Sequence, residues 1–350
     1  MSKLFVVLVA LFVSTSVHAK DLPFEAHPAY PLVKGTVGTE MVWLNNDDLV
    51  FQKRNFDQKT KRAHDDLSMW SFKTKATTFF VNFVGPWCAA NNVIAYTLSR
   101  QSLGSGKFSL KMVHYTASGN KTYETGDLSA AYVRGPYISA LISEHSASRF
   151  TSPEKFNLFD CSWLTSKEFA ALYSADLWGG LRPGDGAIAF KTQPDSKNPK
   201  HPVMKAIHYK MSGEAIELPV AAPGLNIGSV RYHDFRKAYF LTVRAQSKIN
   251  PQNGNCQTAW WFDAKQNRVE QICAPGALLD KYDPIYLPTQ KGLLRMFGKR
   301  DAPVKGIYLT NDKGQTTKIW NGSAFGGAVS PDGCKVAVNA SKPFVLDICK

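Results

Sequence analysis

Three histidines, His64, His145 and His201, lie in segments rich in lysine and arginine. Histidine is suited to general acid–base catalysis because its side chain gains or loses a proton near neutral pH. Basic residues around such a histidine would bind an acidic polysaccharide, and the histidine would act as the general base. One interpretation of the sequence is therefore an enzyme, either a lyase or a hydrolase, that acts on acidic polysaccharides.

Other catalytic signatures are missing from the sequence. It contains no Gly-x-Ser-x-Gly nucleophile elbow and no His-Glu-x-x-His zinc motif. Residues 104–107, Gly-Ser-Gly-Lys, resemble the end of a phosphate-binding loop, but Phe108 stands where such a loop has serine or threonine. The carboxylates at 47–48 and 65–66 are adjacent, whereas a glycosidase needs two carboxylates roughly 5–10 Å apart across a cleft. We therefore assign no catalytic residue and predict no metal site and no cofactor.

The formal net charge of +14 points to an anionic partner. Seven segments that we expect to be loops on one side of the fold contain 18 basic and 7 acidic residues: 52–66, 100–107, 144–156, 191–203, 244–257, 298–305 and 339–343. The predicted binding residues among them are Lys53, Arg54, Lys59, Lys61, Arg62, Arg100, Lys107, Lys197, Lys200, Lys248, Lys299 and Arg300. The alternative is that these lysines and arginines only keep the surface loops soluble.

A repeated pattern indicates how these segments are positioned. A short apolar strand, a polar turn and a second apolar strand recur about every 45 residues, a period typical of propeller blades. Residues 43–51 and 87–95 align without a gap at a spacing of 44. Later copies cover residues 181–189, 233–241, 287–293 and 329–336. The pattern predicts an all-β fold, a β-propeller of four-stranded antiparallel blades.

The number of blades follows from the spacing of the hairpins. His114 and His208 begin similar hairpin sequences 94 residues apart, which is two periods of 47, so one degenerate blade should lie between them. Residues 130–143 and 155–173 can supply its strands. We predict seven blades, with six as the alternative if residues 166–172 form a helical insertion. The last blade lacks an outer strand, and residues 30–34 near the N-terminus are expected to supply it and close the ring.

Aromatic residues are predicted to fill the space between the blades. Trp43 and Trp87 occupy equivalent positions in the repeat and are expected in the core. The adjacent residues Trp260 and Trp261 should point to opposite faces of one strand. His114 also repeats in register with His208, which favours a structural role over metal binding.

One turn carries a recognisable motif. The sequence Val329-Ser330-Pro331-Asp332-Gly333, followed by the apolar residues 336–338, resembles the PD40 repeat of the TolB-like periplasmic propellers. The resemblance covers about one blade. It implies a propeller fold and an exported setting, and by analogy alone a role in outer-membrane assembly. The motif itself is a turn-forming device, because proline presets the backbone and Asp-Gly favours a tight turn.

The N-terminal residues 1–19 have the pattern of a secretory signal peptide. Lys3 precedes the apolar run 4–13, and Val17-His18-Ala19 offers small residues for cleavage. The alternative is an N-terminal membrane anchor. We expect residues 20–350 to form a single propeller domain that is periplasmic or secreted, with no transmembrane segment in the mature chain.

Six cysteines in an exported chain favour disulfide bonds. Cys256 and Cys273 flank one expected hairpin, and Cys334 and Cys349 flank another. Cys88 and Cys161 remain, and they would pair by elimination across neighbouring blades. None of the six has the Cys-x-x-Cys spacing of a zinc or redox site.

Together these features favour a non-catalytic binding protein over the enzyme described above. Its basic loops would bind an acidic protein, an anionic glycan of the cell envelope or lipid headgroups. An inhibitor or immunity-type partner of a secreted toxin belongs to the same class. Nucleic acid is not expected as the primary partner, because the chain has the pattern of an exported protein.

Overall fold

The computed structural model describes a chain that is almost entirely β-strand. The described residues are 22–32, 37–59, 62–85, 87–124, 128–129, 155–157, 161–164, 181–182, 186–194, 202–210, 212, 214–223, 225–245, 259–272, 279, 284–298 and 304–350. The predicted signal peptide, residues 1–19, lies outside them, as does the possible helical insertion at 166–172. Within the described residues, no helix is long and apolar enough to cross a membrane.

The described strands form seven antiparallel sheets, and consecutive strands are neighbours in most of them. The N-terminal half contains β2 (Val37–Trp43), β3 (Asp48–Asp57), β4 (Arg62–Ser71) and β5 (Ala76–Phe83), then β6 (Trp87–Ala90), β7 (Val93–Gly104), β8 (Lys107–Thr116), β9 (Gly119–Glu124) and β10 (Leu128–Ser129), then β11 (Lys155–Asn157) and β12 (Ser162–Leu164). The sheet of β6 to β9 also includes β10, which pairs with the end of β8.

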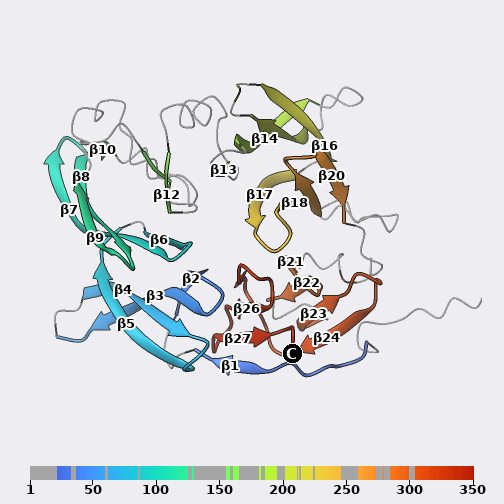
Figure 1. Ribbon diagram of the computed structural model, residues 1–350, viewed down its shortest axis with the longest axis horizontal. Helices are drawn as coiled ribbons and strands as arrows, with labels where there is room; N and C mark the ends of the chain where they lie inside the picture. The colour runs from blue at the N-terminus through green and yellow to red at the C-terminus, as the bar shows by residue number, and fades with distance from the viewer. Residues whose placement is uncertain are drawn as a thin grey trace, which may run out of the picture.

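The C-terminal half repeats the same order of strands. Its sheets are β13 (Leu181–Arg182), β14 (Gly186–Pro194), β15 (Pro202–Tyr209) and β16 (Ala215–Pro223), then β17 (Leu225–His233), β18 (Ala238–Ala245), β19 (Ala259–Asp263) and β20 (Arg268–Gln271), then β21 (Ile285–Thr289), β22 (Gly292–Phe297), β23 (Gly306–Thr310) and β24 (Thr316–Trp320), and finally β25 (Gly327–Val329), β26 (Lys335–Val338) and β27 (Phe344–Asp347). The sheets follow one another around a common centre, which is the arrangement of a β-propeller (Figure 1).

The first strand joins the last sheet. β1 (Ala29–Pro31) pairs antiparallel with β27, with Tyr30 opposite Val345. This strand is three residues long and ends before residues 32–34, which were expected to belong to it. Leu32 instead turns inward, where its side chain is buried and its amide donates a hydrogen bond to the carbonyl of Pro343.

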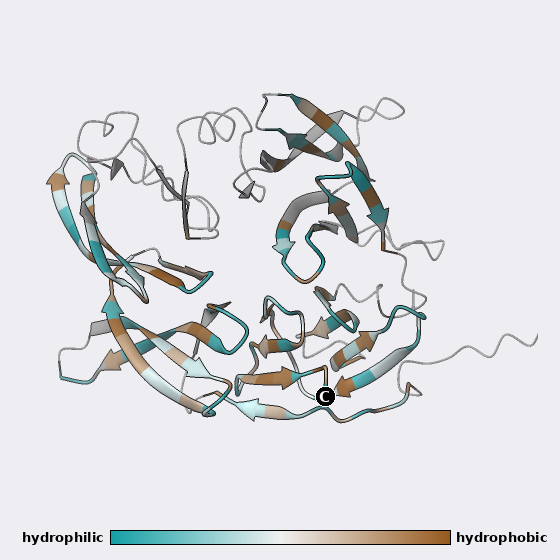
Figure 2. Ribbon diagram, viewed as in Figure 1, coloured by the Kyte–Doolittle hydropathy of each residue, from teal (hydrophilic) through white to brown (hydrophobic). Residues whose placement is uncertain are grey.

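The core lies between neighbouring sheets, because each strand presents alternate residues to its two faces. In β3, Leu49 and Phe51 face the last sheet and pack with Trp70 and Val345, whereas Val50 faces the next sheet. Other clusters join β14–β16 to β17–β20, and β21–β24 to β25–β27. Figure 2 shows the hydrophobic stretches of β26 and β27 that take part.

The aromatic residues singled out in the sequence are confirmed in the core. Trp43 and Trp87 are both buried. Trp260 and Trp261 belong to two different core clusters on the two faces of β19, and both are buried. His208 is buried against Phe262, with ring centroids 5.1 Å apart.

Two predicted loops are instead extensions of strands. Most of segments 52–66 and 100–107 belongs to β3 and β4 and to β7 and β8. Only a two-residue turn, Ser105-Gly106, separates β7 from β8, and both residues have positive φ of 51° and 75°. Such a turn suits a tight hairpin, which explains why the polar sequence does not form a loop.

Two of the three predicted disulfide bonds lie in the described residues, and both are present. Cys88 is bonded to Cys161 over a separation of 73 residues, which ties β6 to the segment before β12. Cys334 is bonded to Cys349 and fastens the turn before β26 to the chain that follows β27. The third predicted pair, Cys256 and Cys273, lies outside the described residues.

Candidate binding surface

The surface predicted to bind is built on two long hairpins. β3 and β7 both begin at a turn beside the neighbouring sheet, and both run past the inner strand of their own sheet. The ends of the β3–β4 and β7–β8 hairpins, residues 52–66 and 98–110, are called the hairpin surface below. Because they belong to two adjacent, packed sheets, they lie on the same side of the molecule.

The first hairpin places basic and acidic residues opposite each other. Arg54 donates from Nε to Oδ1 of Asp65 at 2.9 Å and from Nη2 to Oδ2 at 3.2 Å. The hydrogen bonds from Arg54 hold the pKa of Asp65 below its ordinary value of 3.8. Lys53 is half-buried and stands opposite Asp66 in the register, whereas Lys59 at the turn is exposed. Part of the predicted positive charge is therefore balanced within this hairpin.

The second hairpin carries less acid. The guanidinium carbon of Arg100 lies 3.9 Å from the ring centroid of Phe108, a cation–π contact across the two strands. Lys107 follows the turn and is exposed. Neither Arg100 nor Lys107 forms an ion pair with any described residue, so both charges are available to a partner.

Apolar side chains are exposed beside these charges, and the sequence analysis did not identify them. Phe56 is 57% exposed near the end of the first hairpin, and Leu98 and Leu103 are 42% and 41% exposed on β7. Val84, in the connection between the two sheets, is 57% exposed. Apolar residues at the end of a strand that projects past its sheet are the available signal. The hairpin surface therefore combines positive charge with apolar contacts.

His64 is the only one of the three candidate catalytic histidines within the described residues. Its Nε2 lies 3.6 Å from Oδ1 of Asp66, and its side chain is 48% exposed. The other carboxylate oxygen of Asp66 accepts a hydrogen bond from Asn55. A carboxylate beside an imidazole can orient it and stabilise its charged form. His145 and His201 lie outside the described residues.

A polar contact joins the two sheets beneath the hairpins. Nε1 of Trp87 donates to Oε1 of Gln52 at 3.4 Å. Desolvation raises the pKa of Glu40, and a hydrogen bond from Trp87 acts in the opposite direction. These contacts set the spacing of the first hairpin relative to the second.

The other predicted binding residues are not placed by the structure. Arg62 begins β4, but only its backbone is described. Lys61, Lys197, Lys200, Lys248, Lys299 and Arg300 lie outside the described residues. In the part of the chain that is described, no three His, Cys, Asp or Glu side chains are grouped to hold a metal ion.

The opposite side of the molecule, called the turn face below, is formed by the turns at 44–47, 91–92, 290–291 and 330–334. Backbone and side-chain hydrogen bonds connect these turns between sheets. Asn45 donates from Nδ2 to Oδ1 of Asn92 at 2.8 Å, and the amide of Asp332 donates to Oδ1 of Asn46 at 2.9 Å. The amide of Gln290 donates to the carbonyl of Gly333 at 3.0 Å. These contacts hold four sheets in a fixed order.

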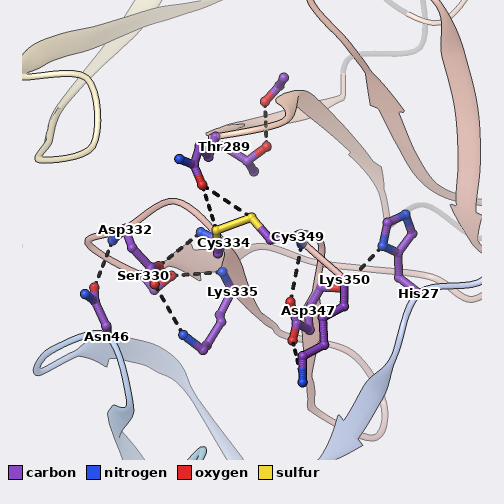
Figure 3. Close-up of a disulfide and its surroundings, with 12 residues drawn as sticks. His27, Asn46, Thr289, Ser330, Asp332, Cys334, Lys335, Asp347, Cys349 and Lys350 are labelled. Carbon is purple, nitrogen blue, oxygen red and sulfur yellow. Dashed lines mark hydrogen bonds and ion pairs between the residues drawn. A yellow bond between two sulfur atoms is a disulfide. The ribbon is translucent and has the colours of Figure 1, made fainter.

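The Ser-Pro-Asp-Gly motif forms one of these turns, as the sequence predicts (Figure 3). Ser330 Oγ accepts a hydrogen bond from the amide of Lys335 at 2.9 Å, and Asp332 Oδ1 accepts one from the amide of Cys334 at 3.1 Å. Burial alone would raise the pKa of Asp332, but bonds from Ser330 and the Cys334 amide, with Lys335 nearby, hold it below 3.8. The motif is structural here.

Comparisons with known proteins add the fold and nothing about activity. No protein-family model matches the chain, and no curated protein matches it. Among solved structures, the β-propeller domain of the Trilobed protease from Pyrococcus furiosus is 10% identical, with a TM-score of 0.36, and the match covers 91% of this chain and 79% of that one.

Two further structures are similar at the same low level. A chain of the Mitotic Checkpoint Complex is 8% identical, with a TM-score of 0.40 and 98% of both chains covered. The GH74 xyloglucanase from Xanthomonas campestris is 12% identical, with a TM-score of 0.43, and the match covers 92% of this chain and 54% of that one. The class of fold, a β-propeller, rests on the sheet topology of this chain, and no function transfers at these scores.

Proposed function

We propose that this chain is an exported binding protein whose hairpin surface binds an anionic partner, either an acidic protein or an anionic polymer of the cell envelope. The observation that carries the proposal is the second hairpin, where Arg100 and Lys107 are exposed and form no ion pair with a described residue. Unbalanced charge on a projecting surface attracts a partner of opposite sign and speeds the encounter. An inhibitor or immunity-type partner of a secreted toxin fits the same description.

The framework of the proposal is a single propeller of seven blades over residues 20–350, closed by β1. Its support is the pairing of β1 with β27 and the core clusters that join successive sheets. The two disulfide bonds support an oxidising compartment, the periplasm or the cell exterior. A closed ring would place the remaining basic loops on the same side as the hairpin surface.

A salt titration with poly-L-glutamate tests the proposed function. We expect saturable binding whose dissociation constant rises steadily as the salt concentration increases from about 0.05 to about 0.3 M, because salt screens exposed charges. Fluorescence anisotropy of a labelled polymer gives the constant at each concentration, and neutral poly-glutamine of equal length is the control. The absence of binding to poly-L-glutamate, or binding that does not depend on salt, would contradict an electrostatic binding surface.

The pairing of His64 with Asp66 supports a second candidate function, a lyase acting on acidic polysaccharide. In that case His64 would take the proton that lies α to the uronate carboxyl group, and the basic residues would bind the polymer. Incubation with uronate polymers should then produce ultraviolet absorbance from an unsaturated product, and His64→Gln should abolish it. Wild-type protein that produces no absorbance with any polymer of the panel would exclude the lyase.

A further inference from the structure

The outer edge of β5 is unusual for an edge strand. Its sequence, Ala-Thr-Thr-Phe-Phe-Val-Asn-Phe, contains no charged residue and no proline. β5 is the last strand of its sheet, and Phe79 on it is 62% exposed. An edge strand presents unpaired backbone N–H and C=O groups, and proteins normally protect such an edge with charge, proline or a covering segment.

The other outer strands of this protein carry that protection. Among the described outer strands of four or more residues, β9 contains Lys121 and Glu124, β16 contains Glu217 and two prolines, β20 contains Arg268 and Glu270, and β24 contains Lys318. β24 is also covered, because Phe24 bridges to Lys318 and the amide of Glu25 donates to the carbonyl of Lys318 at 2.9 Å. Only β5 in this set lacks both charge and proline.

β5 is also held firmly in place, so its edge is a preformed template. Its register with β4 is regular from Ala76 to Phe79, and one irregularity follows at Phe80. The ring of Phe80 packs against Tyr115 and Tyr96, with centroid separations of 5.1 and 6.0 Å. A peptide that adds to this edge would therefore not have to order the strand first.

We propose that the outer edge of β5 binds an extended segment of an acidic partner protein by β-strand addition. Main-chain hydrogen bonds would supply much of the affinity, and β-branched or aromatic side chains opposite Phe79 would supply specificity. The charge of +14 selects this occupant, because it repels a second copy of the chain and attracts an acidic protein. The sign of the partner's charge rests on the proposed function. A glycan has no peptide backbone to extend the sheet.

Two synthetic peptides test the proposal on the full-length protein. The first alternates threonine and valine between flanking glutamates, and the second is the same peptide with alternate backbone amides N-methylated. The methylated peptide keeps its charge and side chains but cannot form a continuous ladder, so we expect its dissociation constant to be at least about tenfold higher. Hydrogen exchange should slow in β5 when the first peptide binds.

The variant Phe79→Lys separates strand addition from simple charge attraction. It adds positive charge, so an electrostatic contact alone would bind the acidic peptide equally well or better. Strand addition instead predicts at least about tenfold weaker binding, because lysine on an edge opposes pairing. Phe325→Lys adds the same charge at another exposed phenylalanine, 53% exposed, and should leave the affinity unchanged.

The remaining outcomes also decide the proposal. Equal binding of both peptides, no binding of the first peptide, or no effect of Phe79→Lys would overturn strand addition, whereas salt-dependent binding of poly-L-glutamate would still support the hairpin surface. A wild-type dimer in sedimentation that Phe79→Lys dissolves would identify a second copy as the occupant and would overturn the acidic partner.

Discussion

Replacement of Lys59, Arg100 and Lys107 together by glutamate is expected to weaken the binding of poly-L-glutamate by about a hundredfold. These three residues are exposed on the hairpin surface. An exposed charge contributes up to about 1 kcal/mol to an ionic contact, so three reversals remove about 3 kcal/mol, and each 1.4 kcal/mol is a factor of about ten in affinity. The dependence on salt should also become shallower, because fewer charges are engaged. Anisotropy titrations of the variant and wild type measure both effects.

A matched variant on the turn face controls for net charge. Lys265, Lys291 and Lys313 are exposed in turns of the opposite side, so their replacement by glutamate changes the net charge by the same amount. If the hairpin surface binds the polymer, this control should lose only a small part of the affinity. Equal losses in the two triple variants would show that binding follows total charge and not a defined surface.

Acid should destabilise the protein through His233. This residue is buried beside Phe235 and Trp261, and desolvation, aided by the charge of Arg231, lowers its pKa from 6.5 to about 3. Below pH 6.5 the unfolded chain binds a proton at this site that the folded chain refuses. The free energy of unfolding should therefore be intact above pH 6.5 and fall by about 1.4 kcal/mol per pH unit from there to about pH 3.

The variant His233→Phe isolates this contribution. Phenylalanine suits the surrounding aromatic rings and cannot take up a proton, so the difference in unfolding free energy between wild type and variant should change with pH in this window. Urea denaturation at several pH values between about 4 and 7 provides the measurement. Parallel pH profiles for the two proteins would show that His233 does not titrate in the expected way. The low pKa of Asp332 adds a loss at lower pH, and Asp332→Asn separates it.

Much of the fold is predictable from repeated local sequence. The copies at 43–51 and 87–95 each form two strands and a tight turn, because the apolar residues fill equivalent places between sheets and Asn45 or Asn91-Asn92 permits the turn. Disulfide pairing across the last sheet follows from the same strand order. The N-terminal strand was also predicted, although its limits shifted because Leu32 is buried rather than paired in the sheet.

The candidate site was less predictable, because composition does not reveal pairing. Lys53 and Arg54 count equally as basic residues in the sequence, yet Arg54 is bound to Asp65 across the hairpin while Lys59 is exposed at its turn. The register between strands decides which charges are balanced, and it depends on the whole sheet. The polar sequence at 100–107 also suggested a loop, and the positive φ of Ser105 and Gly106 allows the strands to continue.

Hydrogen exchange of the wild-type protein with and without poly-L-glutamate tests most directly where the anionic partner binds. Binding at the hairpin surface predicts slower exchange of the amides at 52–59 and 98–110, with no change in the turns at 264–267 and 311–315. Protection of those turns, or protection spread evenly over the chain, would contradict a binding surface on the two hairpins.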